Sequence, residues 1–548
     1  MQIYYNGISI DVKKGTRVID LLKKEIENSE IKVVGCKFNN EVKNLNFEIN
    51  KDGKIELIDL TDKDGMRIYK RGLIYIISKA FKELFDDVKI TIDFQLFHSM
   101  YCTCDNIKIT DEVIKKVKKK VDEIIKRDLP IERKVMTKEE AIKFYEKEKT
   151  LKGKLQLDLK RKKGVTLYYC EDYYNYFYGV LPISTGFITK YDISKYNEGF
   201  LVRYPNESHP DKLIDFVDTP KLFNTLKHYE DVHKVLDINT LYKLNTIIKS
   251  GKILEHILLD EMLHEKEIAK IADEIAKSKK IKLITIAGPS SSGKTTFAKR
   301  LEVQLKINGI KPKIISVDDY FVERKDTPKD KKGNYNFESI DAIDKTLLNN
   351  NLIKLLEGKE IDAPTFDFHE GTKRYLGKKM KLEPNEVLIM EGIHCLNDEL
   401  TYLIPKENKF KIYISALTVL NIDYYNRIST TDTRLIRRIV RDNQFRGYSA
   451  EHTLKMWPSV NNGEIENIFK FQEEADVMFN SSLIYELSVL KDYAMPLLKA
   501  IKQDSPVFSE AKRLYSMLSY FESINSMYVP QNSLLREFIG GSIFEGWE

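Results

Sequence analysis

Residues 1–62 show short runs in which hydrophobic and polar positions alternate, separated by turn signals. "QIYY" and "ISIDV" flank Asn6-Gly7, and an Asn-Gly pair between such runs is the strongest short signal for a β-hairpin. A helical pattern runs from Thr16 to about Glu27, and "KVVGCKF" and "KIELIDL" supply further strands. The pattern predicts a small β-grasp module.

Residues 63–224 mix helical and strand patterns, which predicts a second, α+β domain. Its clearest helix is "DEVIKKVKKKVDEIIKRD", which has one apolar stripe and a lysine-rich opposite face. The stripe consists of Ile114, Val117, Val121 and Ile124. The lysines are typical of a solvated face, and an RNA-facing surface is the alternative. The aromatic run 167–179 predicts a packed sheet with exposed tyrosine hydroxyls, and base stacking is the alternative.

The periodicity changes twice more along the chain. Residues 225–280 are mostly helical and predict a connector that packs against the next domain. From residue 281, apolar strands alternate with helices, which is typical of a parallel sheet flanked by helices. The expected strands are "KLITIA", "KIISV", "VLIM" and "FKIYIS". We therefore expect a multidomain protein of α/β and α+β type, with a C-terminal domain at 281–500 and a tail at 501–548.

Composition narrows the class of protein. The chain has 548 residues, 42% hydrophobic and 31% charged, which fits a globular protein of several domains. Five scattered cysteines predict no disulfide framework. We see no signal peptide and no run approaching the ~20 apolar residues of a membrane span, so we expect a cytoplasmic protein without a membrane partner. A net charge of +6 is too mild to indicate nucleic-acid binding by itself.

The stretch "GPSSSGKT" satisfies the pattern G-x-x-x-x-G-K-[ST] between a strand and the helical "KTTFAKRLEVQLKIN". Small residues let backbone N–H groups turn around phosphate oxygens, and the helix N-terminus adds partial positive charge. Lys294 would reach the β- and γ-phosphates, and Thr295 would hold Mg²⁺. The predicted nucleotide-binding residues are Gly288, Pro289, Ser290, Ser291, Ser292, Gly293, Lys294, Thr295 and Thr296.

Two carboxylates follow expected strands, at the edge where open α/β sheets bind ligands. Asp318 comes after "KIISV" and is placed to accept a proton from an attacking hydroxyl, although a turn or helix cap is the alternative role. Glu391 comes after "VLIM" and is expected to serve the metal.

The segment "TDTRLIRRIVRDNQFRG" predicts a helix with one arginine-rich face. The arginines on that face are Arg434, Arg437, Arg438 and Arg441. Because like charges on one face repel, an anionic ligand is the preferred explanation, with a mobile lid over transferring phosphate. A structural helix of salt bridges is the alternative. We assign Arg434 and Arg437 to the nucleotide and Arg438 and Arg441 to catalysis.

Together these segments resemble the uridine kinase and phosphoribulokinase group of P-loop kinases, in the order "GPSSSGKT", "SVDDYF", "NFESIDAID", "APTFDF", "MEGI" and "DTRLIRRIVRD". The resemblance implies transfer of the ATP γ-phosphate to a sugar hydroxyl, with Asp318 as base and Glu391 at a Mg²⁺ ion. GTP is the alternative donor. Arginines of the 434–446 segment would contact phosphates.

The acceptor pocket implied by that resemblance is altered. Uridine kinases typically carry Asp where this chain has Glu338, a base-stacking Tyr where it has Phe366, and Arg where it has Tyr448 after Arg446-Gly447. Near their base-reading His stands Gly371, with His369 close by. We assign Glu338, Phe366, Arg438, Arg446 and Tyr448 to the acceptor. Loss of polar contacts changes discrimination, so phosphorylation is better supported than uridine as substrate.

The N-terminal part resembles threonyl-tRNA synthetase. Residues 1–62 are similar to its TGS domain, and the following domain is similar to its second additional, editing domain. The helix "YKRGLIYIISKA" lacks the histidines of that family's editing site, and "YNYFYGVLP" lacks its Cys and His. We expect no hydrolytic editing, and binding of RNA or a small ligand, or a role in packing or dimerisation, stay open.

The sequence therefore predicts an Mg²⁺-dependent nucleoside kinase fused to a synthetase-like N-terminal half. A regulatory ATPase or RNA-associated sensor is one alternative, motivated by the lysine-rich helix and "KRKKG" at 160–164. A kinase for a non-nucleoside sugar is another. The expected partner is a small-molecule acceptor, and the oligomeric state stays open.

Overall fold

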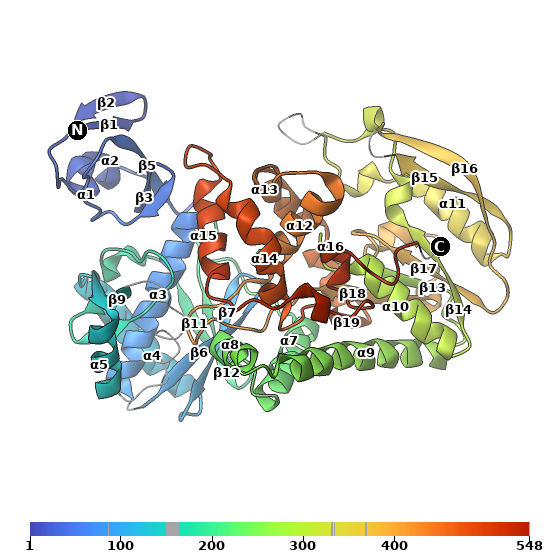
Figure 1. The fold of residues 1–548 in the computed structure, drawn as a ribbon, viewed down its shortest axis with the longest axis horizontal. Coiled ribbons are helices and arrows are strands. Elements are labelled where there is room, and N and C mark those ends of the chain that lie inside the picture. Colours follow the sequence, from blue (N-terminus) through green and yellow to red (C-terminus); the bar gives the residue numbers. More distant parts are fainter. Residues whose placement is uncertain (86, 149–163, 330–332, 334, 368–369, 547–548) are drawn as a thin grey trace.

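A computed structural model describes residues 1–85, 87–148, 164–329, 333, 335–367 and 370–546 of the chain. Figure 1 shows the small N-terminal module at one end and the parallel sheet at the other, with helices between them. The turn at 160–164 and His369, which the sequence singles out, lie outside the described residues, except for Gly164. Among the described helices, none combines the length and the apolar character that crossing a membrane requires.

The N-terminal module is one five-stranded sheet in the order β2-β1-β5-β3-β4. Its strands are β1 (Gln2–Tyr5), β2 (Ile8–Asp11), β3 (Val33–Phe38), β4 (Glu41–Lys43) and β5 (Gly53–Asp59). β1 and β5 run parallel, whereas the other pairs are antiparallel. The expected single helix is divided at Leu22 into α1 (Val18–Leu21) and α2 (Lys23–Glu27), because Leu22 leaves the helical conformation to enter the core.

The second domain packs two helices on an antiparallel sheet in the order β11-β12-β7-β6. Its elements are α3 (Lys63–Leu84), β6 (Lys89–Leu96), β7 (Ser99–Asp105), α4 (Asp111–Arg127), β8 (Glu132–Thr137), α5 (Lys138–Glu148), β9 (Gly164–Cys170), β10 (Tyr173–Asn175), β11 (Asp192–Tyr196) and β12 (Gly199–Arg203). The predicted apolar stripe of α4 is buried at all four positions. The α+β expectation for this part is confirmed.

The aromatic run at 167–179 packs into a small sheet of β8, β9 and β10. Tyr168, Tyr176 and Phe177 are buried. The expectation of exposed hydroxyls is wrong for Tyr174 and Tyr178, whose hydroxyl oxygens are buried. The Tyr168 hydroxyl donates to Gly179 O at 2.6 Å, and that of Tyr173 donates to Ser78 Oγ at 2.6 Å. Internal hydrogen bonds remove the desolvation cost that a buried hydroxyl otherwise carries.

The helices of the expected connector pack against the next domain, as the sequence predicts. They are α7 (Pro220–Val235), α8 (Leu241–Lys249) and α9 (Ile253–Lys277). α9 is the long helix along the lower edge of Figure 1. Its Ile268, Ile271 and Ile275 pack against Ile284 and Ile286 of the parallel sheet. α9 therefore covers one face of that sheet.

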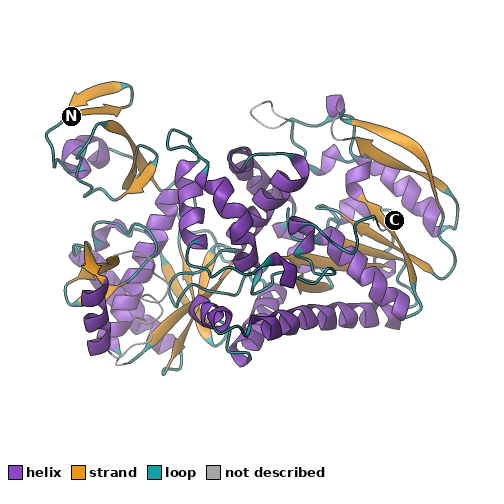
Figure 2. Cartoon of the chain, viewed as in Figure 1, coloured by secondary structure: helices purple, strands orange, loops and turns teal. Residues whose placement is uncertain are grey.

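The parallel sheet has the order β14-β17-β13-β18-β19. Its strands are β13 (Leu283–Ala287), β14 (Lys311–Ser316), β17 (Glu386–Glu391), β18 (Lys409–Ser415) and β19 (Val477–Asn480). The four strands predicted from the sequence are confirmed, whereas the short β19 was not predicted. Helix α10 (Lys294–Ile307) packs with α9 on one face, and α11 (Lys345–Leu356) packs on the other, beside the hairpin of β15 (Ile361–Asp367) and β16 (Thr372–Met380) (Figure 2). This is the expected helix-flanked parallel sheet.

The remaining helices are α12 (Thr430–Arg446), α13 (Ala450–Asn467), α14 (Glu486–Lys499), α15 (Phe508–Leu518) and α16 (Arg536–Ile539). Leu514 and Phe538, from the region expected to form a separate tail, share one core with Leu435 and Ile439 of α12. Residues 501–546 therefore contribute to the hydrophobic core of the C-terminal domain.

Hydrogen bonds and ion pairs join the two halves of the chain. Asn421 Nδ2 donates to Ile92 O at 2.9 Å, and Ile92 N donates to Tyr424 O at 2.9 Å. Farther along the interface, Arg67 on α3 pairs with Glu510 on α15 at 2.7 Å. Arg513, one turn farther along α15, pairs with Asp432 of α12 at 2.6 Å. The second domain thus contacts the loop before α12 directly and reaches α12 itself through α15.

Candidate active site

The loop Gly288–Gly293 joins the central strand β13 to α10 and has the backbone geometry of a phosphate cradle. Ser291 and Gly293 adopt positive φ values of 59° and 89°. A Cβ on Gly288 would come within 2.0 Å of Ile414 O, so only glycine fits there. Lys294 Nζ donates to Gly288 O at 3.0 Å, which folds this ammonium back over the loop. Thr295 is exposed at the helix start.

Asp318 and Glu391 lie at the same edge of the sheet as this loop. In the strand register Ser316 of β14 pairs with Glu391 of β17, and Glu391 pairs with Ile286 of β13 on its other side. Asp318 follows β14 by two residues. The parallel strands therefore bring the two predicted carboxylates beside the loop that begins after Ala287, as expected for the ligand edge of an open α/β sheet.

Both carboxyls are electrostatically perturbed. Burial raises the pKa of Glu391 to about 7, and the charge of Asp318 adds to this rise. Loss of surrounding water also raises the pKa of Asp318, although Lys294 and Arg446 oppose the shift. Ser316 Oγ donates to Glu391 Oε1 at 3.1 Å and partly stabilises its charged form. Carboxyls whose pKa values are perturbed by burial and by a neighbouring charge are typical of functional sites.

These residues fit a magnesium ion. Glu391 and the Thr295 hydroxyl supply oxygen donors, which Mg²⁺ prefers, and a cation held there would relieve the repulsion between the Glu391 and Asp318 carboxylates. Within the described residues, no group of three or more His, Cys, Asp or Glu side chains is arranged to hold a metal by itself. A magnesium ion would therefore take further oxygens from bound phosphates, as it commonly does.

The predicted arginine lid is wrong for Arg434 and Arg437. Their side chains are only 1% and 0% exposed, respectively. Arg434 forms a two-pronged ion pair with Glu464, with Nη2 to Oε2 at 2.8 Å, and Arg437 Nε pairs with Glu486 at 2.6 Å. Because α12 is packed in the core, its arginines are neutralised by buried carboxylates on α13 and α14, the reading the sequence left as the alternative.

Buried ion pairs hold the phosphate loop at Ser290. Ser290 N donates to Glu464 Oε1 at 2.8 Å, and Ser290 O accepts from Arg434 Nη1 at 3.2 Å. The Ser290 hydroxyl accepts from Arg438 Nη1 at 2.8 Å. Arg437 likewise donates to Ser291 O at 3.3 Å. The two arginines assigned to the nucleotide thus support the loop through its carbonyls.

Sequence reasoning missed Glu464 because it lies far from the loop in the chain and belongs to no motif. A second missed residue is Asp442, which is 1% exposed and contacts three arginines. Arg438, Arg441 and Arg446 reach its carboxylate at 3.2, 2.9 and 3.5 Å. The sequence carried one signal for it, since Asp442 stands four residues after Arg438.

The residues predicted for the acceptor do not all face one surface. Glu338 contacts α13, where a Cβ on Gly463 would lie 2.5 Å from the Glu338 Cβ. Tyr448 is 44% exposed and packs near His452. Phe366 is 6% exposed, with its ring 5.6 Å from that of Phe321 in the core, and its assignment to the acceptor stays a prediction. A phenyl ring gains more from burial than the tyrosine it replaces.

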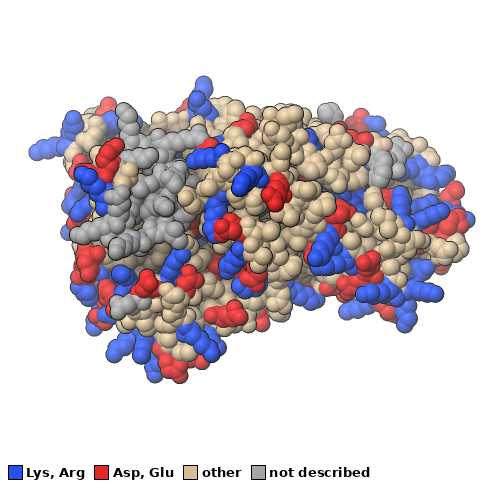
Figure 3. All heavy atoms as spheres, turned by 60° about the horizontal axis from the view of Figure 1, so that its bottom comes forward, with Lys and Arg blue, Asp and Glu red and all other residues tan. Residues whose placement is uncertain are grey.

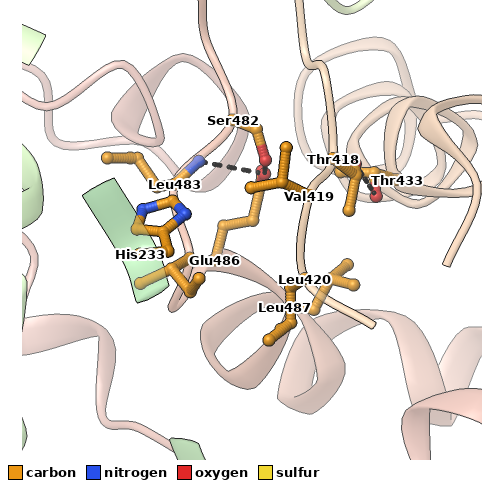
Figure 4. A pocket seen from close by; sticks show the side chains of 10 residues that line it. His233, Thr418, Val419, Leu420, Thr433, Ser482, Leu483, Glu486 and Leu487 are labelled. Carbon is orange, nitrogen blue, oxygen red and sulfur yellow. Dashed lines mark hydrogen bonds between the residues drawn. The ribbon is translucent and has the colours of Figure 1, made fainter. Parts of the chain in front are cut away.

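The small cavity in Figure 4 is not lined by the phosphate loop, Asp318 or Glu391. It lies among His233, Thr418, Thr433 and Ser482, with other residues from the segments around them. Its volume of about 10 Å³ holds a single water at most. Ser482 Oγ donates to Glu486 Oε1 at 3.0 Å on its wall. The cavity thus lies in the packing around Glu486, the ion-pair partner of Arg437, and is too small for a substrate.

Comparisons with known proteins agree with this geometry. The profile of the Phosphoribulokinase / Uridine kinase family matches residues 283–486. A uridine kinase of Deinococcus deserti is 30% identical over 175 residues, which make up 32% of this chain and 75% of that protein. A uridine kinase of Mycoplasma genitalium is 33% identical over 178 residues, which make up 32% and 74%. The chain belongs to this kinase family.

The N-terminal half has other relatives. A threonine–tRNA ligase of Clostridium kluyveri is 33% identical over 183 residues, which make up 33% of this chain and 29% of that enzyme. The chain spans less than a third of the length of the threonine–tRNA ligases it matches. The expected fusion of a kinase domain with a synthetase-like half is confirmed.

Proposed function

We propose that this chain is an ATP-dependent kinase that transfers the γ-phosphate to the 5′-hydroxyl of a nucleoside. The observation that carries the proposal is the strand register that brings Asp318 and Glu391 beside the phosphate loop at one edge of the sheet. Membership of a family whose relatives include uridine kinases supports it further.

The chemistry follows from these positions. Loop amides and Lys294 bind the phosphates, and Arg438 and Arg441 add positive charge where negative charge spreads during transfer. Asp318 accepts the hydroxyl proton as the acceptor oxygen attacks, and its raised pKa makes it a better base than an ordinary aspartate. Thr295 and Glu391 hold Mg²⁺, which when bound neutralises phosphate charge.

Substitution of the proposed base tests this assignment. Asp318→Asn should abolish phosphoryl transfer and leave ATP binding nearly unchanged, because the amide keeps the shape but cannot take the proton. Asp319→Asn is the matched control, since Asp319 Oδ1 accepts from Phe366 N at 3.3 Å and an amide oxygen can do the same. Unchanged turnover in Asp318→Asn would remove the base assignment.

The acceptor pocket leaves a second candidate, a non-nucleoside sugar or alcohol. Phe366 is buried and Tyr448 replaces a cation, so two polar contacts to a base are missing. Labelled ATP with a panel of nucleosides and sugars, measured as kcat/KM for each, decides between them. A preference for a free sugar over every nucleoside would contradict the nucleoside proposal.

For the synthetase-like half we propose a binding role, with RNA as the ligand to test first. Lys115, Lys116, Lys119 and Lys126 of α4 are exposed. Figure 3, however, shows basic and acidic side chains interspersed over the face it views. Over its described residues, that face therefore has no continuous basic surface that would favour RNA. Filter binding of total tRNA across salt concentrations tests it, and no salt-dependent binding at low ionic strength would rule RNA out.

A further inference from the structure

The C-terminal segment 533–546 lies directly on the phosphate loop. Glu537 Oε2 accepts a hydrogen bond from Thr296 N at 3.1 Å. A Cβ on Gly293 would come within 2.4 Å of Leu534 Cδ2, so Leu534 covers the second glycine of the loop. Lys299 Nζ donates to Phe544 O at 3.4 Å. Residues 533–546 therefore contact the first half of α10 as well as the loop before it.

This segment is firmly built into the domain. The Arg536 guanidinium donates to Ser526 O at 3.0 Å and to Gly540 O at 3.2 Å, which closes the chain around it. Leu535 and Phe538 are fully buried in the core that also contains α12. The Glu537 carboxylate is therefore positioned by its neighbours on both sides.

The amide that Glu537 engages belongs to the anion-binding end of α10. The first N–H groups of a helix have no partner within it and attract phosphate when a glycine-rich loop precedes them. Phe297 N donates to Gly293 O at 3.0 Å, which is the first hydrogen bond within α10. Thr296 N, one residue earlier, therefore has no acceptor in the helix itself. A carboxylate from the chain itself holds this donor.

The Glu537 carboxylate lies next to the residue expected at the metal, because its hydrogen-bond donor Thr296 directly follows Thr295. A donor phosphate bound at this end of α10 would carry the same sign of charge as Glu537 and would draw on the same N–H group.

We propose that Glu537 is a determinant of nucleotide affinity, because its carboxylate competes with a phosphate of the donor for the Thr296 N–H. Nucleotide binding then breaks this contact and loosens the segment 533–546 from the loop. The inference rests on the proposed function only in assuming that the loop binds a nucleotide, and it does not depend on the acceptor.

Calorimetric titration with ADP and Mg²⁺ tests the competition without any acceptor or turnover. Glu537→Gln removes the charge and nearly keeps the shape, so it should bind ADP about tenfold more tightly than the wild type, because a charged hydrogen bond no longer has to be broken. Glu545→Gln is the matched control: Glu545 lies in the same segment but accepts from Ser542 N at 3.2 Å. Its ADP affinity should equal that of the wild type.

Hydrogen exchange of the wild type gives a second readout that needs no variant. ADP should increase exchange in the backbone amides of residues 533–546 while it protects those of the phosphate loop. Equal or increased protection of residues 533–546 with ADP would overturn the proposal, as would equal or weaker ADP binding by Glu537→Gln. If neither the wild type nor any variant binds ADP, the proposed function itself fails. That outcome is distinct from equal binding by all three proteins.

Discussion

Glu338 is expected to lower the stability of the protein as pH rises. Burial raises the pKa of its carboxyl to about 7, and Glu464 and Asp318 add to the rise. Arg438 and Lys294 oppose it but do not cancel it. The folded protein therefore favours the protonated form of Glu338, because the ionised form would be buried near the carboxylates of Glu464 and Asp318.

The sign and size follow from the two states. Below pH 4.5 the carboxyl is protonated whether the chain is folded or not, so Glu338 adds no pH-dependent term. As pH rises from 4.5 to about 7, the unfolded chain loses this proton first and stability falls. Above about pH 7 the free energy of unfolding is reduced by the full difference between the folded and unfolded pKa values, which is at most about 3 kcal/mol. Glu338→Gln removes this loss.

Thermal unfolding of the wild type and Glu338→Gln between about pH 5 and 8.5 measures the effect. The variant should match the wild type at the acidic end and exceed its Tm by several degrees at the basic end, at roughly 2–4 °C per kcal/mol for a domain of ordinary size. Glu360→Gln, at an exposed position on the turn after α11, should track the wild type throughout. A difference in Tm that does not change with pH would refute the reasoning.

Three further outcomes are expected. Affinity for Mg²⁺ in the presence of ADP should fall about tenfold per pH unit below 7, because Glu391 must lose its proton, and a flat calorimetric profile would contradict this. Arg434→Met should cost about 3–5 kcal/mol in denaturant unfolding, since it leaves Glu464 buried and unpaired, and Arg434→Met with Glu464→Met should recover part of it; no recovery would argue against the pair. Arg513→Met should speed hydrogen exchange at the start of α12 through loss of the 2.6 Å contact with Asp432, and unchanged exchange would show that the contact contributes little.

The strongly periodic parts of the chain were predictable. The phosphate loop, four strands of the parallel sheet and the apolar stripe of α4 follow from local patterns whose physical basis lies within a few residues. Asp318 and Glu391 were found because they follow predicted strands, and the ends of parallel strands meet at one edge.

The partners of the arginines were not predictable in the same way. Arg434 and Glu464 are 30 residues apart, with most of α12, a turn and most of α13 between them, and no spacing rule links a residue on α12 to one on α13. An arginine that binds phosphate and one that pairs with a buried carboxylate look alike in a sequence. Glu537 is separated from Thr296 by more than two hundred residues, so only the folded chain brings them together.

The contacts of Ile92 with Asn421 and Tyr424 bear on where this chain can be divided into fragments. A recombinant fragment beginning near residue 281 would lose the strand that pins the 421–426 loop, along with α9 and its isoleucines. Phe94 and Tyr101 would no longer shield Leu417 and Val419. The C-terminal domain thus shares its core and hydrogen bonds with the preceding half, and a fragment limited to it would need a redesigned surface where the two halves meet.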